Sequence, residues 1–136
     1  MTGGRAGFVA HVRGARAVRV SWRVHVDVSF RIQWWRTNTF ARTEAFDKWL
    51  RALKDSKARA RIAQRIESAQ AGNFGDCGPV GEGVSEMRIH VGGGYRVYYM
   101  RIGNTIYLLL AGGAKSTQKR DIRRALELAQ SLRKAP

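Results

Sequence analysis

The chain has 136 residues, which is enough for one domain with a single core, and its 44% hydrophobic content excludes a wholly disordered protein. No stretch approaches the roughly 20 apolar residues that a membrane-spanning helix requires, so a soluble, cytoplasmic protein without membrane contact is expected. Lys and Arg number 25 against 10 Asp and Glu, giving a net charge of +15, and the expected partner is therefore polyanionic, with nucleic acid ahead of an acidic protein.

The first 36 residues differ in composition from the rest. Residues 1–36 hold seven arginines, no lysine, one acidic residue and three of the four tryptophans. Apolar and polar residues alternate from Val18 to Ile32, which is the period of a strand. Three interpretations stay open: an added hairpin or edge strand, a targeting presequence, and a stretch upstream of the natural start of translation. We therefore expect an N-terminal extension at 1–36 and one folded domain at 37–136.

The domain is expected to open with a short strand at 39–42 and two helices. Thr43 can cap the first helix, because apolar residues follow it at helical spacing. Ser56 can cap the second helix, which places Ile62 and Ile66 on one face. The two helices should form a hairpin, and the apolar stripe of the first helix should belong to the core: Phe46, Trp49, Leu50 and Leu53.

The second half of the domain is expected to contain three strands and a helix. The glycine-rich segment 72–83 predicts a loop. Gly112 and Gly113 predict a turn, after which Thr117 can cap the last helix. Between these features, glycine-containing turns separate three strands of an antiparallel meander, at 85–91, 95–101 and 105–111. The order is thus β-α-α-β-β-β-α, an α+β domain.

Strand geometry groups several polar side chains. Alternate residues point to opposite faces of a strand, so Arg88 shares a face with His90, and Arg96 shares a face with Tyr98. These side chains are expected on one open polar surface, with Lys115 at its rim. The single cysteine, Cys77, excludes an internal disulfide, and few histidines are present, so neither a metal nor a cofactor is expected.

Four strings of the domain stand in a fixed order: FDKWLRALKDSKARARI, GVSEMRI, GYRVYY and LLLAGGAKSTQKRDI. Together they resemble the addiction-module killer proteins, a HigB-like branch of the RelE and ParE toxin superfamily, over residues 37–133. The resemblance implies a fold related to microbial RNases. In that fold, two N-terminal helices and a C-terminal helix pack on one face of a small antiparallel sheet, and the other face accepts RNA.

The resemblance also implies a function. It indicates the toxin of a type II toxin-antitoxin system, a metal-independent endoribonuclease that cuts messenger RNA on the ribosome. The expected partner is a cognate antitoxin, often of the helix-turn-helix type, through which alone the toxin would reach operator DNA. Two alternatives stay open: a ParE-like, non-catalytic inhibitor of DNA gyrase, and a basic nucleic-acid-binding module.

RNA cleavage by the neighbouring 2′-hydroxyl requires a base, an acid, and positive charge for the crowded phosphorane. The resemblance assigns Arg96 to the scissile phosphate, and assigns Lys115 to transition-state charge or protonation of the leaving group. Residue type alone also allows the alternative that each of them is a solvated surface cation. Arg88 is a candidate for a flanking phosphate, or for a surface pair with Glu86 or Glu82. His90 is the candidate general base, or a structural histidine.

The remaining candidates concern RNA binding. Tyr98 is expected either to stack on a base or to pack in the core. Asp121 stands where some RelE toxins have a catalytic tyrosine, and a surface pair with Lys119 or Arg124 is the expected role. Basic residues on the second helix and at the start of the last helix are candidates for phosphate contacts, or a solvated face: Lys57, Arg61, Arg65 and Lys119.

Overall fold

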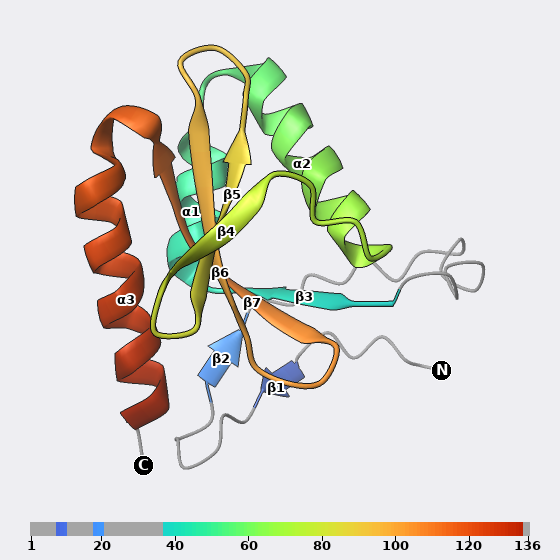
Figure 1. The fold of residues 1–136 in the computed structure, drawn as a ribbon, viewed down its shortest axis with the longest axis vertical. Helices are drawn as coiled ribbons and strands as arrows, with labels where there is room; N and C mark the ends of the chain where they lie inside the picture. The colour runs from blue at the N-terminus through green and yellow to red at the C-terminus, as the bar shows by residue number, and fades with distance from the viewer. Residues whose placement is uncertain (1–7, 11–17, 21–36, 135–136) are drawn as a thin grey trace.

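The computed structural model describes residues 8–10, 18–20 and 37–134, and the ribbon in Figure 1 shows their arrangement. Strand β1 (Phe8–Ala10) pairs antiparallel with β2 (Val18–Val20), in a two-stranded sheet separate from the main one. The remainder of the strand expected at 18–32 lies outside the described residues. No helix among the described residues is both long enough and apolar enough to cross a membrane.

The main sheet has five strands in the order β3-β7-β6-β5-β4. Their bounds are β3 (Thr39–Arg42), β4 (Cys77–Gly81), β5 (Val84–Ile89), β6 (Tyr95–Arg101) and β7 (Ile106–Ala114). The three later expected strands are confirmed as an antiparallel meander, and β6 has the predicted bounds. The sheet as a whole is mixed, not antiparallel, because β3 lies parallel to β7. A parallel pair is possible here because helices carry the chain from β3 back across the sheet.

Strand β4 corrects the expectation of a loop at 72–83. Cys77 pairs with Met87 and Gly78 pairs with Glu86, with an irregularity between Pro79 and Gly81. A proline is tolerated because β4 is an edge strand, on which one row of backbone amides needs no partner strand. The order of the domain is therefore β-α-α-β-β-β-β-α.

Three helices surround the sheet: α1 (Glu44–Ala52), α2 (Ser56–Gln70) and α3 (Gln118–Lys134). Thr43 caps α1 as predicted, since its hydroxyl accepts a hydrogen bond from the amide of Phe46. The cap of α2 is Asp55 and not Ser56, because the Asp55 carboxylate accepts from the Ala58 amide. Thr117 ends a 3-10 turn, η2 (Lys115–Thr117), and its hydroxyl bonds to Asp121 instead of capping α3.

The helices cover both faces of the sheet, which corrects the expected arrangement on one face. Figure 1 shows α3 on one side of the strands, with α1 and α2 across from it. Ala125 and Ala129 of α3 pack in one buried cluster with Tyr98. Phe46 of α1 and Ile62 of α2 belong to another. Both faces of the sheet therefore contribute to a buried core.

Gly112 and Gly113 lie inside β7 and not in the predicted turn. A side chain at Gly112 would meet the ring of Trp49 from α1, and one at Gly113 would meet the carboxylate of Asp121 from α3. The two glycines therefore let helices approach the sheet closely from opposite faces.

Candidate active site and basic surface

A polar cluster lies between β5, β6 and the first turn of α3. The strand register places Glu86 opposite Tyr98 and Arg88 opposite Arg96. Because alternate residues share a face, all four lie on the face toward α3, as the strand period predicts. This shared face makes contact possible between residues that are eight or more positions apart in the chain.

Glu86 is the centre of this cluster. The residue is only 4% exposed, yet three side chains reach its carboxylate. Gln118 donates to Oε1 at 2.9 Å, and Arg88 donates through Nε to Oε2 at 3.0 Å. Arg96 lies farther off, with its Nε 3.6 Å from Oε1. A buried carboxylate with two cations and an amide around it has its charge compensated.

Arg96 is not on an open surface, which corrects the expectation for this residue. It is 7% exposed, and its counter-charge is Glu86. One guanidinium nitrogen donates to the Tyr95 carbonyl at 3.3 Å, whereas Nε has no hydrogen-bond partner. The start of α3 covers the site, because Gly113 is the strand partner of Arg96 and the Asp121 carboxylate lies over Gly113. In this conformation Arg96 does not present its guanidinium to an RNA phosphate.

Tyr98 is fully buried, so its side chain cannot stack on a base, and the packing alternative describes it. Its hydroxyl has no hydrogen-bond partner, and burial together with the nearby carboxylates of Glu86 and Asp121 raises its pKa. Asp121 is 4% exposed and pairs with Arg120, whose Nε lies 3.5 Å from Oδ1. The expected surface pair of Asp121 with Lys119 or Arg124 is therefore wrong, because the carboxylate points inward to Thr117.

A second group of charges continues from this cluster to the surface. Arg88 turns its guanidinium from Glu86 to Asp76, whose Oδ1 it contacts at 2.8 Å. The other carboxylate oxygen, Oδ2, lies 2.6 Å from Nε2 of His90. The hydrogen bonds from His90 and Arg88 lower the pKa of Asp76, and Asp76 with Glu86 raises the pKa of Arg88. The pairing alternative for Arg88 thus holds for Glu86, with Asp76 as an additional partner.

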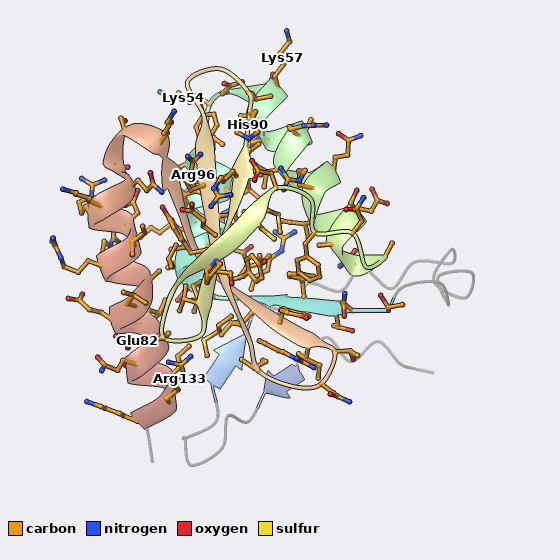
Figure 2. All side chains as sticks on the ribbon, in the orientation of Figure 1. Lys54, Lys57, Glu82, His90, Arg96 and Arg133 are labelled. Atoms are coloured by element: carbon orange, nitrogen blue, oxygen red, sulfur yellow. The ribbon has the colours of Figure 1, made fainter. Side chains whose placement is uncertain are left out.

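His90 is the exposed end of this chain of contacts. Its side chain is 68% exposed, and Figure 2 shows it near the same end of the molecule as Lys54 and Lys57. When Nε2 donates its proton to Asp76, the other ring nitrogen, Nδ1, keeps a lone pair. The arrangement can therefore supply a base at the surface, beside the guanidinium of Arg88.

Lys115 borders the same end of the sheet. Its amide donates to the carbonyl of Gly94 at 3.0 Å, which places it against the turn that follows His90. Lys57, Arg61, Lys115 and Lys119 are all exposed, and the guanidinium of Arg61 donates to Gln64 at 2.9 Å. These residues are free to meet a phosphate backbone.

Arg65, in contrast, has its guanidinium occupied. It donates to the carbonyls of Phe74 at 3.0 Å and Asp76 at 3.1 Å, and to the carbonyl of Arg88. Burial lowers the pKa of this guanidinium. The expected RNA contact of Arg65 is therefore replaced by a structural one, in which α2 holds the segment before β4.

Sequence reasoning missed Asp76 and the burial of Glu86. Asp76 stands among glycines in a segment expected to be a loop, and its partner His90 is 14 residues away. Only the pairing of β4 with β5 brings the two together. An acid between turn residues is a weak signal, so no local pattern could have identified it.

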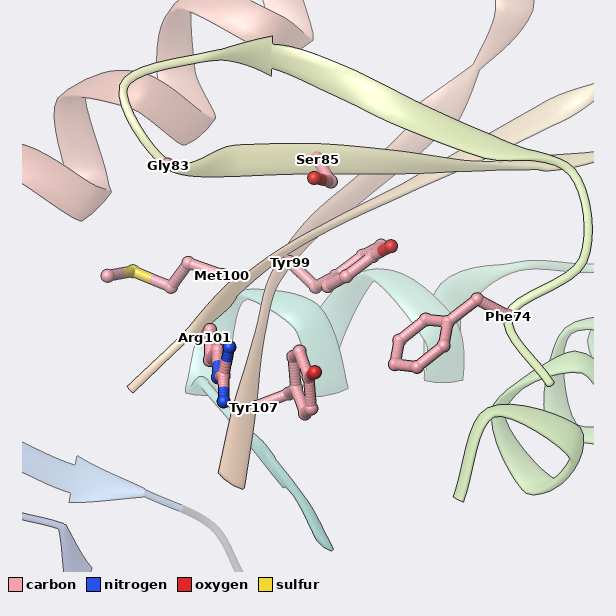
Figure 3. Close-up of a pocket in the computed structure, with 7 residues that line it drawn as sticks. All are labelled: Phe74, Gly83, Ser85, Tyr99, Met100, Arg101 and Tyr107. Carbon is pink, nitrogen blue, oxygen red and sulfur yellow. The ribbon is translucent and has the colours of Figure 1, made fainter. Parts of the chain in front are cut away.

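The protein also has a pocket of about 310 Å³ away from this site. Figure 3 shows aromatic rings at its wall, among them that of Tyr99. Tyr99 belongs to the buried cluster on the sheet face opposite to Tyr98. Phe74 and Tyr99 stack at 5.6 Å between ring centres. The lining residues are Phe74, Gly83, Ser85, Tyr99, Met100, Arg101 and Tyr107. None of them takes part in the charged cluster.

The known proteins to which the chain is similar match most of the domain 37–136. The family model described as phage derived protein Gp49-like matches residues 48–134. A protein of Haemophilus influenzae, described as uncharacterized, is 49% identical over 90 residues, which cover 66% of this chain and 91% of that protein. No solved structure matches the chain.

Proposed function

Because the chain belongs to the family of phage-derived Gp49-like proteins, we propose that it is the toxin of a type II toxin-antitoxin pair and cuts messenger RNA on the ribosome. The family is one of RelE- and HigB-like toxins, and a cognate antitoxin partner follows from that membership. The cleavage reaction and its residues are our proposal.

One observation carries the proposal: an exposed imidazole, His90, contacts a carboxylate, Asp76, that also binds the half-buried guanidinium of Arg88. His90 is 68% exposed and Arg88 is 33% exposed, so both are accessible to a substrate. A net charge of +15 attracts RNA through its phosphates. Base and positive charge at one accessible place are two of the three requirements for cleaving RNA without an external nucleophile.

The proposed reaction is an in-line displacement at phosphorus. Nδ1 of His90 takes the proton of the 2′-hydroxyl, and the freed oxygen forms a bond to the adjacent phosphorus. The bond from phosphorus to the 5′ oxygen breaks, and that oxygen takes a proton from the ammonium of Lys115. One fragment then ends in a 2′,3′-cyclic phosphate and the other begins with a 5′-hydroxyl.

The cationic side chains have separate proposed roles in stabilising charge and in binding RNA. Arg88 contacts the non-bridging oxygens of the reacting phosphate and stabilises the charge that develops there. Arg96 lies behind it, where its buried charge compensates Glu86 together with Arg88. Lys57, Arg61 and Lys119 bind phosphates of the flanking RNA or of the ribosome. The ribosome supplies the alignment of the messenger, which offsets a single imidazole as catalyst.

RNA-end mapping after induced expression tests the proposal. The wild-type protein should produce new, codon-spaced 5′ ends in cellular messages, whereas His90→Ala and Lys115→Ala should produce few or none. Lys134→Ala is the matched control, because it removes an exposed cation from the other end of α3 and should cleave as the wild type does. Intact messages together with DNA damage would instead favour gyrase inhibition, and salt-dependent RNA binding without growth arrest would favour a simple binding module.

A further inference from the structure

We infer that Asp76 is a positioning residue that selects which nitrogen of His90 serves as the base, and that Arg65 holds Asp76 in place. The inference rests on the proposed role of His90 and extends it to two residues with no other assigned part in the reaction. Neither is proposed to touch the substrate.

The contact between Asp76 and His90 decides the chemistry of the ring. At 2.6 Å, Oδ2 of Asp76 accepts the proton of Nε2, so the neutral ring carries its hydrogen on that nitrogen. Nδ1 then keeps its lone pair and faces away from the carboxylate. Among residues 37–134, Asp76 is the one hydrogen-bond partner of the His90 side chain. Without it, an exposed imidazole is free to turn and to exchange tautomers.

Asp76 is itself fixed at both its side chain and its backbone. Arg88 binds Oδ1 of Asp76 at 2.8 Å, which leaves Oδ2 to the imidazole of His90. The Arg88 amide donates to the Asp76 carbonyl at 2.9 Å, so the backbone of Asp76 is tied to β5. The carboxylate therefore has one orientation available, with one oxygen for each partner.

Arg65 of α2 joins the two backbone segments that carry this contact. Its guanidinium donates to the carbonyls of Phe74 and Asp76 on one segment and of Arg88 on the other. The chain turns closely around it: Gly75 has a φ of +66°, and a side chain there would meet the guanidinium. A planar guanidinium can serve several acceptors at once, whereas a lysine ammonium has no such fork.

Single-turnover cleavage of messenger RNA on purified ribosomes provides the test, with purified full-length variants. His90→Ala should lower the rate roughly 10²- to 10⁴-fold, the range for a lost general base. Asp76→Asn should lower it at least roughly tenfold, because the asparagine amide can donate to Nε2 and move the ring proton to Nδ1. Arg65→Lys should lower it in the same direction but by less. Glu127→Gln, an exposed change on α3, should leave the rate unchanged.

A second measurement separates positioning from loss of structure. Nitrogen-15 NMR of the imidazole distinguishes the two neutral tautomers, and the His90 signal is assigned by its absence in His90→Ala. The wild type should show hydrogen on Nε2, and Asp76→Asn should show a shift toward Nδ1 while the circular dichroism spectrum stays unchanged. Asp76 has a half-exposed side chain, so its replacement does not open a core cavity.

The outcomes distinguish the inference from the function on which it rests. If His90→Ala abolishes cleavage while Asp76→Asn cleaves at the wild-type rate with an unchanged tautomer, the inference is overturned and the proposed function stands. If His90→Ala itself cleaves normally, the proposed role of His90 is wrong and the inference falls with it. A tautomer shift in Asp76→Asn together with a lowered rate supports both.

Discussion

The buried ion pair of Glu86 and Arg96 makes a quantitative prediction about stability. Replacing Glu86 by leucine removes the counter-charge of two arginines, but the two are affected differently. Arg88 keeps Asp76 as a partner and is 33% exposed, so Asp76 and water compensate for the lost contact with Glu86. Arg96 has a side chain only 8% exposed, and among the described residues no other carboxylate lies within ion-pair distance of it. The cost therefore falls on Arg96.

The expected magnitude follows from the burial of this charge. Removing one partner of a buried ion pair costs about 3–5 kcal/mol, because it leaves an uncompensated charge in a poorly polarisable surrounding. At a separation of 3.6 Å the pair is weaker than a direct hydrogen bond, so we expect about 3 kcal/mol for Glu86→Leu. This is a large fraction of the roughly 5–15 kcal/mol that holds a domain folded.

A double-mutant cycle provides the assay. Arg96→Met removes the buried charge, so the combination of Glu86→Leu with Arg96→Met should be more stable than Glu86→Leu alone, with a coupling of at least about 2 kcal/mol. Urea unfolding followed by far-ultraviolet circular dichroism measures each variant, and Glu127→Leu on the exposed face of α3 serves as the control. A loss below about 1 kcal/mol for Glu86→Leu, with additive effects in the double variant, would refute the buried pair.

Three further predictions test the packing and the surface charges. Gly112→Ala should cost about 1–3 kcal/mol in urea unfolding, because its methyl group would enter the ring of Trp49, whereas Gly93→Ala, which has open space, should cost little. Thr43→Val should lower the unfolding free energy by about 1–2 kcal/mol, since the buried hydroxyl both caps α1 and donates to a β7 carbonyl; an unchanged midpoint would contradict this. The lowered pKa of Asp76 means that its stabilisation is present above its ordinary value of 3.8 and disappears as the pH falls through the lower folded value. The stability difference between wild type and Asp76→Asn should accordingly shrink in acid, and a difference that grows there would contradict the contact.

Local patterns predicted most of the helices and strands. The cap at Thr43 and the apolar spacing behind it identified α1, and the glycine-containing turns on either side of 95–101 identified β6 to the residue. These features succeed because the signal lies within a few residues of the structure that it specifies. The prediction of a loop at 72–83 was wrong for the same reason. Its glycines are typical of a turn, and part of the segment forms β4 only because it pairs with β5.

In the candidate site, too, the local pattern predicted the face on which a side chain lies but not its exposure. Strand alternation placed Arg88, Arg96 and Tyr98 on one face, which the register bears out. Their exposure could not be predicted in this way, because α3, which begins 20 residues or more after them, covers this face and contributes Gln118 as a partner of Glu86. Whether an arginine meets RNA or a buried carboxylate depends on what covers it, and no neighbouring residue in the chain records that.

The amino-acid sequence alone determined the class of the fold, the succession of the helices and the meander, and a basic protein with the strings of a toxin family. Tertiary structure decided that β3 runs parallel to β7, that helices occupy both faces, and that Asp76 meets His90. The reason is physical: periodicity and caps act over one or two turns of chain. Pairing and burial depend on contacts between residues 14 to 67 positions apart in the chain, whose geometry exists only once the sheet has formed.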